Sequence, residues 1–317
     1  VDMYSSPILG LNGNLQIDSL IADSMQLDTV KFRIRSDHDE FNYQAQVINN
    51  KENPQYVFHA VADGRLNERG SYLRTKLYDA DNKLGVDVAL LAELEHRSIR
   101  FSVADAHPIL GYKNFTVNDS NYVLLSDDRR VSANVELRST DGMGLKVYTN
   151  DENLDALQDV TISLHQFQLH DILSVVPYMP NISGILDGDY HLIQTKDELS
   201  VSSDMTIHRL IYENCPMGDI GTEFVYMPKH DGSHVVDGLL TQNGHEIALI
   251  NGSYRSGGKG NIDAKITLER TPLSLVNGFI PQQLIGFKGT AEGSLSLKGT
   301  LKNPNVNGEV YLDSAYL

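Results

Sequence analysis

The sequence predicts an all-β protein, built largely as an antiparallel meander with two short helices. Three observations lead to this prediction. Apolar and polar residues alternate along most of the 317 residues, which places the apolar side chains on one face of a sheet. Turn-forming residues separate the alternating runs at intervals of roughly 8–14 residues. Helical periodicity is confined to two segments of about two turns each.

The predicted strands follow one another along the whole chain. Alternating runs occur at 43–47, 86–90, 131–137, 160–164 and 264–268. Turns are expected between them at 53–54, 63–64, 79–82, 231–232, 243–244 and 257–258, where Asn, Asp, Gly or Pro stand together. Asn-Gly between alternating runs is a strong hairpin signal. The last 29 residues predict two further strands, joined by a turn at Asn303-Pro304-Asn305.

The two helical segments each end at a proline, Pro177 and Pro281. Their apolar positions are Leu169, Ile172, Leu173 and Val176 in the first segment, and Leu273, Val276 and Ile280 in the second. Thr271-Pro272 is typical of an N-cap followed by Pro at the first helical position. Helices this short are not stable alone. We therefore expect each one to pack its apolar stripe against the sheet.

An internal repeat links these two segments. Asp159–Leu164 matches Asp263–Leu268 at an offset of 104, and Gly184, Gly188 and Leu192 match Gly289, Gly293 and Leu297 at an offset of 105. The repeat predicts an N-terminal segment over 1–150 and a C-terminal segment over 151–317 that holds two repeats, 159–262 and a truncated 263–317. Its paired glycines predict points where a long strand bends. We interpret the chain as a fragment of a longer protein.

Composition excludes several classes of function. The net charge is −16 and no Lys/Arg run exceeds two residues, which argues against nucleic-acid binding and against docking on anionic lipid headgroups. A single cysteine, Cys215, excludes a disulfide scaffold and a cysteine-rich zinc site. The absence of Trp lowers the expectation of carbohydrate stacking. No apolar run approaches the 18 residues of a membrane-spanning helix.

Residues that could carry catalysis or bind metal are present without a convincing arrangement. His230 and His234 lie four apart in a turn without a nearby third ligand, and residues 79–85 lack the Gly and terminal Glu of a calcium loop. The acidic run at 37–40 is typical of a solvated hairpin tip. No G-x-S-x-G motif occurs. We expect no enzymatic activity, no metal and no cofactor.

The C-terminal strands resemble the repeats of the TamB family, the large envelope proteins of the bacterial translocation and assembly module, which are related to AsmA-like proteins. The pattern is carried by Leu297, Gly299, Thr300, Pro304, Val306, Gly308, Val310 and Leu312. Residues 7–49 are similar to the same type of repeat. The resemblance is one of pattern, strongest at 259–317, and short Gly/Leu repeats also occur in adhesins and other solenoids.

The resemblance implies a fold, a place and a task. The fold is an elongated, antiparallel, U-shaped β-trough with an apolar inner face and one or two short plug helices. The place is the periplasm of a diderm bacterium, with an inner-membrane anchor outside this chain. The task is outer-membrane biogenesis, either by carrying phospholipid or by helping outer-membrane proteins assemble. The implied partners are phospholipid or an unfolded outer-membrane protein strand, and an outer-membrane barrel of the assembly-module type.

An apolar trough would bind its cargo through the alternating apolar positions. The candidate groove residues are Val160, Ile162, Leu164, Ile262, Ala264, Ile266, Leu268, Leu295, Leu297, Val310 and Leu312. Burying a lipid acyl chain yields about 0.8 kcal/mol per CH₂. Two alternatives stay open. A β-repeat adhesin would close the apolar face with a second sheet, and a β-solenoid hydrolase or lyase acting on polysaccharide would need convergent carboxylates in a cleft.

Overall fold

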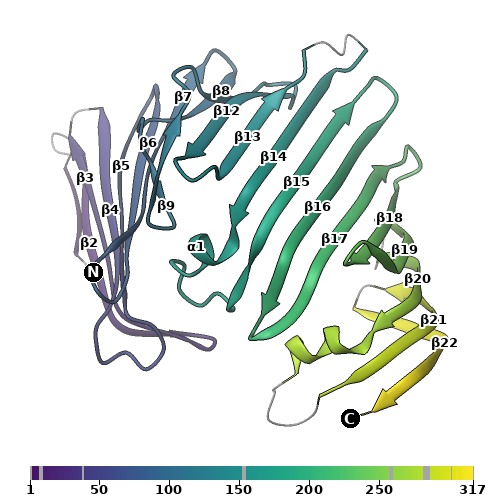
Figure 1. The fold of residues 1–317 in the computed structure, drawn as a ribbon. Helices are drawn as coiled ribbons and strands as arrows, with labels where there is room; N and C mark the ends of the chain where they lie inside the picture. The colour runs from purple at the N-terminus through teal and green to yellow at the C-terminus, as the bar shows by residue number, and fades with distance from the viewer. Residues whose placement is uncertain are drawn as a thin grey trace. The chain divides into compact units, whose positions relative to one another are not determined.

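The computed structural model confirms an all-β, antiparallel fold in which most strands pair with the strands next to them in the sequence (Figure 1). It describes residues 2–6, 10–37, 39–151, 155–256, 260–280, 286–300 and 302–316. Pro281 and the predicted turn at 257–258 lie outside the described residues. The chain forms two compact units: unit 1 holds residues 1–147 and 171–179, and unit 2 holds residues 148–170 and 180–317.

Unit 1 begins as a meander from β1 to β8, and the pairing then leaves sequence order: β9 pairs with β7 and β10, β11 with β8 and β12, and β10 with β12. Strand β13 lies at the boundary of the unit in the sequence. The strands are β1 Asp2–Ser6, β2 Gly10–Ala22, β3 Met25–Asp37, β4 Glu40–Asn49, β5 Phe58–Asn67, β6 Gly70–Tyr78, β7 Leu84–Glu95, β8 Ser98–Val103, β9 Ile109–Leu110, β10 Lys113–Val117, β11 Tyr122–Leu125, β12 Val131–Ser139 and β13 Gly144–Thr149. Its buried core includes Phe115, Ala133 and Met143.

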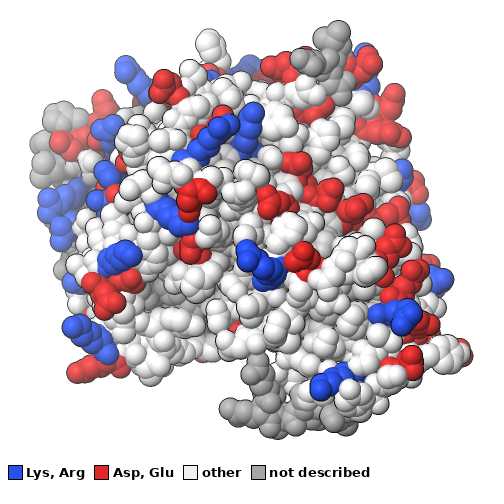
Figure 2. All heavy atoms as spheres, in the orientation of Figure 1, with Lys and Arg blue, Asp and Glu red and all other residues white. Residues whose placement is uncertain are grey.

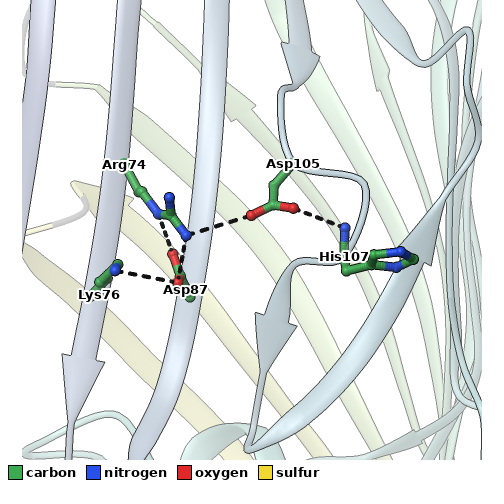
Figure 3. A network of polar contacts seen from close by, with 5 residues as sticks. All are labelled: Arg74, Lys76, Asp87, Asp105 and His107. Carbon is green, nitrogen blue, oxygen red and sulfur yellow. Dashed lines mark hydrogen bonds and ion pairs between the residues drawn. The ribbon is translucent and has the colours of Figure 1, made fainter.

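The polar side of unit 1 contains a buried ion pair (Figure 3). Asp87 accepts hydrogen bonds from Nε and Nη2 of Arg74, at 2.7 and 2.8 Å. Lys76 Nζ lies 3.7 Å from the same carboxylate, and Arg74 Nη2 lies 3.7 Å from Asp105. Asp105 in turn accepts a hydrogen bond from the backbone N–H of His107. The network ties strands β6 and β7 to the segment that follows β8.

Unit 2 is a second meander, made of longer strands. They are β14 Gln158–Gln168, β15 Ile182–Gln194, β16 Leu199–Tyr212, β17 Cys215–Pro228, β18 Ser233–Gln242, β19 His245–Arg255, β20 Asn261–Pro272, β21 Lys288–Thr300 and β22 Asn303–Tyr316. The 3-10 helix η1 Leu273–Phe279 belongs to this unit, and the α-helix α1 Leu169–Leu173 is divided between the two units at residue 171. Figure 1 shows β14 to β17 side by side as long, steeply inclined strands.

The strands of unit 2 bend along one line that crosses the sheet. Residues with positive φ, or shifts in pairing register, occur in neighbouring strands at nearly the same level. They are Gln166, Gly184, Arg209, Gly218, Arg270, Gly289 and Ser314, together with the shift after Leu240 in the β18–β19 pair. Bulges bend a strand and increase its twist. The long strands of this unit are therefore folded across their length.

The internal repeat recurs in this backbone geometry. The bulge in β14 has its extra residue at Gln166 (φ 48°) and that in β20 at Arg270 (φ 49°), at the repeat offset of 104. Gly188 and Gly293 both have φ of 142°. A Cβ at either position would lie 2.1 Å from a carbonyl oxygen of the neighbouring strand. The paired glycines are thus required by close backbone approach and by left-handed backbone conformation.

Both short helices exist, but their packing differs from the predicted stripes. In the first segment the buried residue is Val175, which packs on Gly85 in unit 1, whereas Val176 is 41% exposed. In the second segment Val276 is 45% exposed and Gly278 is buried against Met217 and Tyr212. The second helix is a 3-10 helix with three residues per turn, so a spacing based on 3.6 residues selects the wrong side.

Three local predictions are wrong because they assign a helix cap or a turn to residues that lie in strands. Thr271 does not cap the second helix; it lies in β20, and its hydroxyl donates to the carbonyl of Ile247. Asp63-Gly64 lies inside β5, because Gly64 makes room there for the Tyr43 ring. Asn303–Asn305 is the start of β22 and pairs with β21. Proline is tolerated near the start of an edge strand, so Pro304 did not end this one.

Candidate functional site

The candidate site is one face of the sheet formed by β14 to β22 in unit 2. Residues directly paired across neighbouring strands share a face, and the pairing registers give three rows. The first row is Val160, Leu192, Val201, Tyr226, Val236, Gly252, Ala264, Leu297 and Val306; the second is Ile162, Tyr190, Ser203, Phe224, Gly238, Ile250, Ile266, Leu295 and Gly308; the third is Leu164, Gly188, Met205, Thr222, Leu240, Ala248, Leu268, Gly293 and Val310. None of these residues is charged. We call this surface the apolar face.

All the groove residues predicted from the sequence lie on this side of the sheet. Nine of them belong to the three rows, and Ile262 and Leu312 lie one row beyond them, at opposite ends. Sequence reasoning missed the middle of the face, including Tyr190, Phe224 and Ile250. No clear alternation marks the strands of Phe224 and Ile250, because Val225 and Leu249, which point to the other face, are also apolar.

Much of the apolar face is open to solvent. Ile162 and Tyr190 are each 39% exposed, Ile250 is 41% exposed and Val306 is 57% exposed. Tyr190 and Phe224 contact each other edge to face, with ring centroids 6.1 Å apart. With nine strands about 4.8 Å apart and three rows about 7 Å apart, the face measures on the order of 40 by 14 Å along the sheet. Exposed apolar surfaces of this size mark binding sites.

A line of bulges crosses the sheet of unit 2 beside the third row of the apolar face. Two residues of that row are buried there: Met205 is 7% exposed and Ala248 is 6% exposed. Among the bulged residues, Arg209 and Arg270 are exposed, whereas Met217 and Ile247 are buried. The apolar face is therefore more buried beside the bulges than in its first two rows.

An aromatic cluster borders the apolar face at the edge away from the bend. His234 stacks on Tyr226 with ring centroids 5.9 Å apart, and its Nδ1 lies 2.7 Å from the Tyr226 hydroxyl. Tyr254 lies on the other side of His234, also at 5.9 Å. Rings with one apolar side and one polar atom suit a boundary between apolar surface and water. This edge thus grades from aliphatic to aromatic side chains.

The opposite face of unit 2 is polar and largely acidic. Asp189, Asp204 and Glu223 lie directly opposite one another on β15, β16 and β17. Figure 2 shows acidic side chains gathered over these strands on the side turned to the viewer. A wide hollow on the same face is lined by Lys265, Glu269 and other residues of both charges. Charge thus separates the two faces.

Comparisons with known proteins leave the site to be judged from its geometry. No protein-family model, curated protein or solved structure matches this chain. Among the described residues, no group of three or more His, Cys, Asp or Glu side chains is placed to hold a metal ion. Neither of the two helices in the described part of the chain is long and apolar enough to cross a lipid bilayer.

Proposed function

We propose that unit 2 binds the acyl chains of phospholipid on its apolar face and so acts as a segment of a lipid-carrying protein. The observation that carries the proposal is a surface of nine strands without a charged side chain, parts of which are about 40–60% exposed. A surface of this kind gains free energy when an apolar ligand displaces water from it.

The energetics favour an acyl chain as the ligand. Burying a fourteen-carbon stretch gives on the order of 10 kcal/mol before ordering costs, at about 0.8 kcal/mol per CH₂. The face has a few Tyr, Ser and Thr hydroxyls but no charged group to hold a charged ligand. Its exposed Ile and Val side chains also speak against the adhesin alternative, in which a second sheet would cover them.

The resemblance to TamB repeats supplies the biological setting of this proposal. The protein would work in the periplasm of a diderm bacterium as part of an inner-membrane-anchored protein in outer-membrane biogenesis. It would move phospholipid between membranes without catalysing a reaction. Its partners would be the phospholipid itself and an outer-membrane barrel of the assembly-module type.

The test is a pair of substitutions on opposite faces of one strand. Ile266→Asp places a carboxylate in the middle row of the apolar face, and Thr267→Asp places the same group on the polar face one residue later. The purified proteins are incubated with vesicles of phosphatidylethanolamine and phosphatidylglycerol, re-isolated, and their bound lipid is quantified. We expect at least a tenfold loss of bound lipid for Ile266→Asp and less than a twofold change for Thr267→Asp.

Two outcomes contradict the proposal. Equal lipid binding by a folded Ile266→Asp variant and by the wild-type protein removes the apolar face as the binding site. Equal loss in both variants shows that the added charge acts by itself, wherever it is placed. Circular dichroism of both variants establishes that they are folded.

A second candidate function rests on β22. Its residues 303–316 are all exposed, and among the described residues β22 pairs only with β21. An open edge of this length can accept an added strand. An unfolded outer-membrane protein strand would then bind by backbone hydrogen bonds. Hydrogen exchange tests this: an amphipathic ten-residue peptide should slow exchange of the β22 amides, and unchanged exchange removes the candidate.

A further inference from the structure

The polar face of unit 1 carries a cluster of three arginines, two on β3 and one on β5, with β4 between them. Arg33 pairs with Gln44 and Gln44 with Asp63, while Arg35 pairs with Asn42 and Asn42 with Arg65. Direct pairing places these side chains on one face in two adjacent rows. The arginine cluster, Arg33, Arg35 and Arg65, therefore surrounds two amide side chains and a single carboxylate.

The same residues line a hollow of about 600 Å³. Tyr72 also lines the hollow, and the centre of its ring lies 5.5 Å from the Arg65 guanidinium carbon. Arg33 Nε donates a hydrogen bond to the side chain of Asn14 on β2, at 3.2 Å. None of the three arginines forms an ion pair with a carboxylate of the described residues. Their remaining N–H groups are thus available to a ligand.

The three arginines stand close enough on one face to repel one another. Two unit positive charges at a spacing of about 7 Å, which separates alternate residues of a strand, repel each other in water by roughly 0.6 kcal/mol. Elsewhere in unit 1 Arg74 is neutralised by Asp87, so the fold does pair an arginine where pairing stabilises it. The protein carries a net charge of −16, which makes a hollow with three arginines and one aspartate a local exception.

We propose that the arginine cluster binds a phosphate group. Guanidinium groups bind phosphate through paired N–H···O bonds, and three of them match the several acceptor oxygens of a phosphate monoester. The side-chain amides of Asn42 and Gln44 supply further donors between the arginines. This site is separate from the apolar face of unit 2 and does not depend on lipid binding there.

Titration calorimetry of the whole chain tests the proposal, with inorganic phosphate and with dihexanoyl phosphatidic acid below its micellar concentration. The variant Arg35→Gln/Arg65→Gln removes two charges from the hollow. Arg130→Gln/Arg138→Gln removes two charges from exposed positions elsewhere in unit 1 and is the matched control. We expect binding at least tenfold weaker in the first variant and changed less than twofold in the control.

The two ligands identify the source of the phosphate. Tighter binding of the phosphatidic acid indicates a lipid headgroup, and equal affinities indicate a free phosphate group; both support the site. The proposal is overturned when neither ligand binds saturably, or when Arg35→Gln/Arg65→Gln binds as the wild-type protein does.

Discussion

The residue that most clearly decides local stability in unit 1 is Asp87. Its side chain is 9% exposed and accepts two hydrogen bonds from Arg74, whose side chain is 34% exposed. Removing one partner leaves the other charge with poor solvation. We expect Asp87→Asn to lower the free energy of unfolding by about 2 kcal/mol, less than for a fully buried pair because Arg74 reaches water.

Urea unfolding followed by circular dichroism measures this change. The matched control is Asp128→Asn, which also removes one carboxylate charge but from an exposed pair with Arg130, at 2.9 Å. Exposed pairs contribute little, so the control should change the free energy of unfolding by less than about 0.5 kcal/mol. Equal effects of the two substitutions would show that Asp87 is not a structural ion pair.

The acidity of unit 1 carboxylates predicts a pH dependence. Hydrogen bonds from Arg74 lower the pKa of Asp87, and hydrogen bonds from Lys113 and Ser139 lower the pKa of Asp141 to about 2. Both pKa values lie below the unfolded value of about 3.9. Their stabilising contributions are therefore complete above that value and are lost as the pH falls through the folded pKa values.

This effect is checked by repeating the urea experiment between pH 6 and pH 2. The wild-type protein should lose stability toward pH 2, and the difference between wild type and Asp87→Asn should shrink over the same range. A difference that stays constant down to pH 2 would contradict the assignment of Asp87 as the titrating group.

At the scale of the element, the long strands of unit 2 depend on positions where the backbone comes close to its neighbour. In β15, a Cβ on Gly188 would lie 2.1 Å from the Asp204 carbonyl oxygen, and φ is 142°. In β18, a Cβ on Gly238 would find its nearest atom at 3.6 Å. These two glycines on the apolar face differ in the space around them.

Gly188→Ala should therefore destabilise the protein by about 2 kcal/mol or more, because both the backbone conformation and the neighbouring carbonyl oppose the methyl group. Gly238→Ala should stay within about 0.5 kcal/mol of the wild type, or gain slightly from reduced freedom of the unfolded chain. Thermal unfolding of the two variants makes the comparison. Similar melting temperatures would refute the close approach at Gly188.

The elements differ in how far their sequence predicts them. Alternation determined the strands because a period of two has one structural meaning in a half-exposed sheet. The second helix failed in detail: a stripe at i, i+3 and i+7 presumes an α-helix, and the chain forms a 3-10 helix at 273–279. Asp63-Gly64 failed as a turn, because glycine serves equally as space for a neighbouring ring such as Tyr43.

At the scale of the whole molecule, the faces of the sheets matter more than any single residue. In unit 2 the repeat placed the groove residues of β14, β20, β21 and β22 on one face, and the pairing registers extend that face through the five strands between them. From the sequence, only the paired glycines indicated that the strands bend. Non-glycine residues such as Gln166 and Arg209 also take positive φ there, and no sequence pattern signals this.

The arginine cluster of unit 1, in contrast, could not be predicted from the sequence. Arg33 and Arg35 are close in sequence, but Arg65 joins them only through the pairing of β3, β4 and β5. The overall charge of −16 argued against nucleic acid and anionic lipid headgroups as ligands. The net charge governs long-range attraction of a ligand, whereas binding inside a small hollow depends on the charges of the side chains that line it.

The central claim is that the apolar face of unit 2 holds phospholipid, and mass spectrometry of an organic extract tests it most directly. The protein is purified without detergent from cells of a diderm bacterium, and its extract is compared with that of the Ile266→Asp variant. We predict one or more phospholipid molecules per wild-type chain and at least tenfold less in the variant. An extract free of phospholipid, or the same amount from both proteins, would contradict the claim.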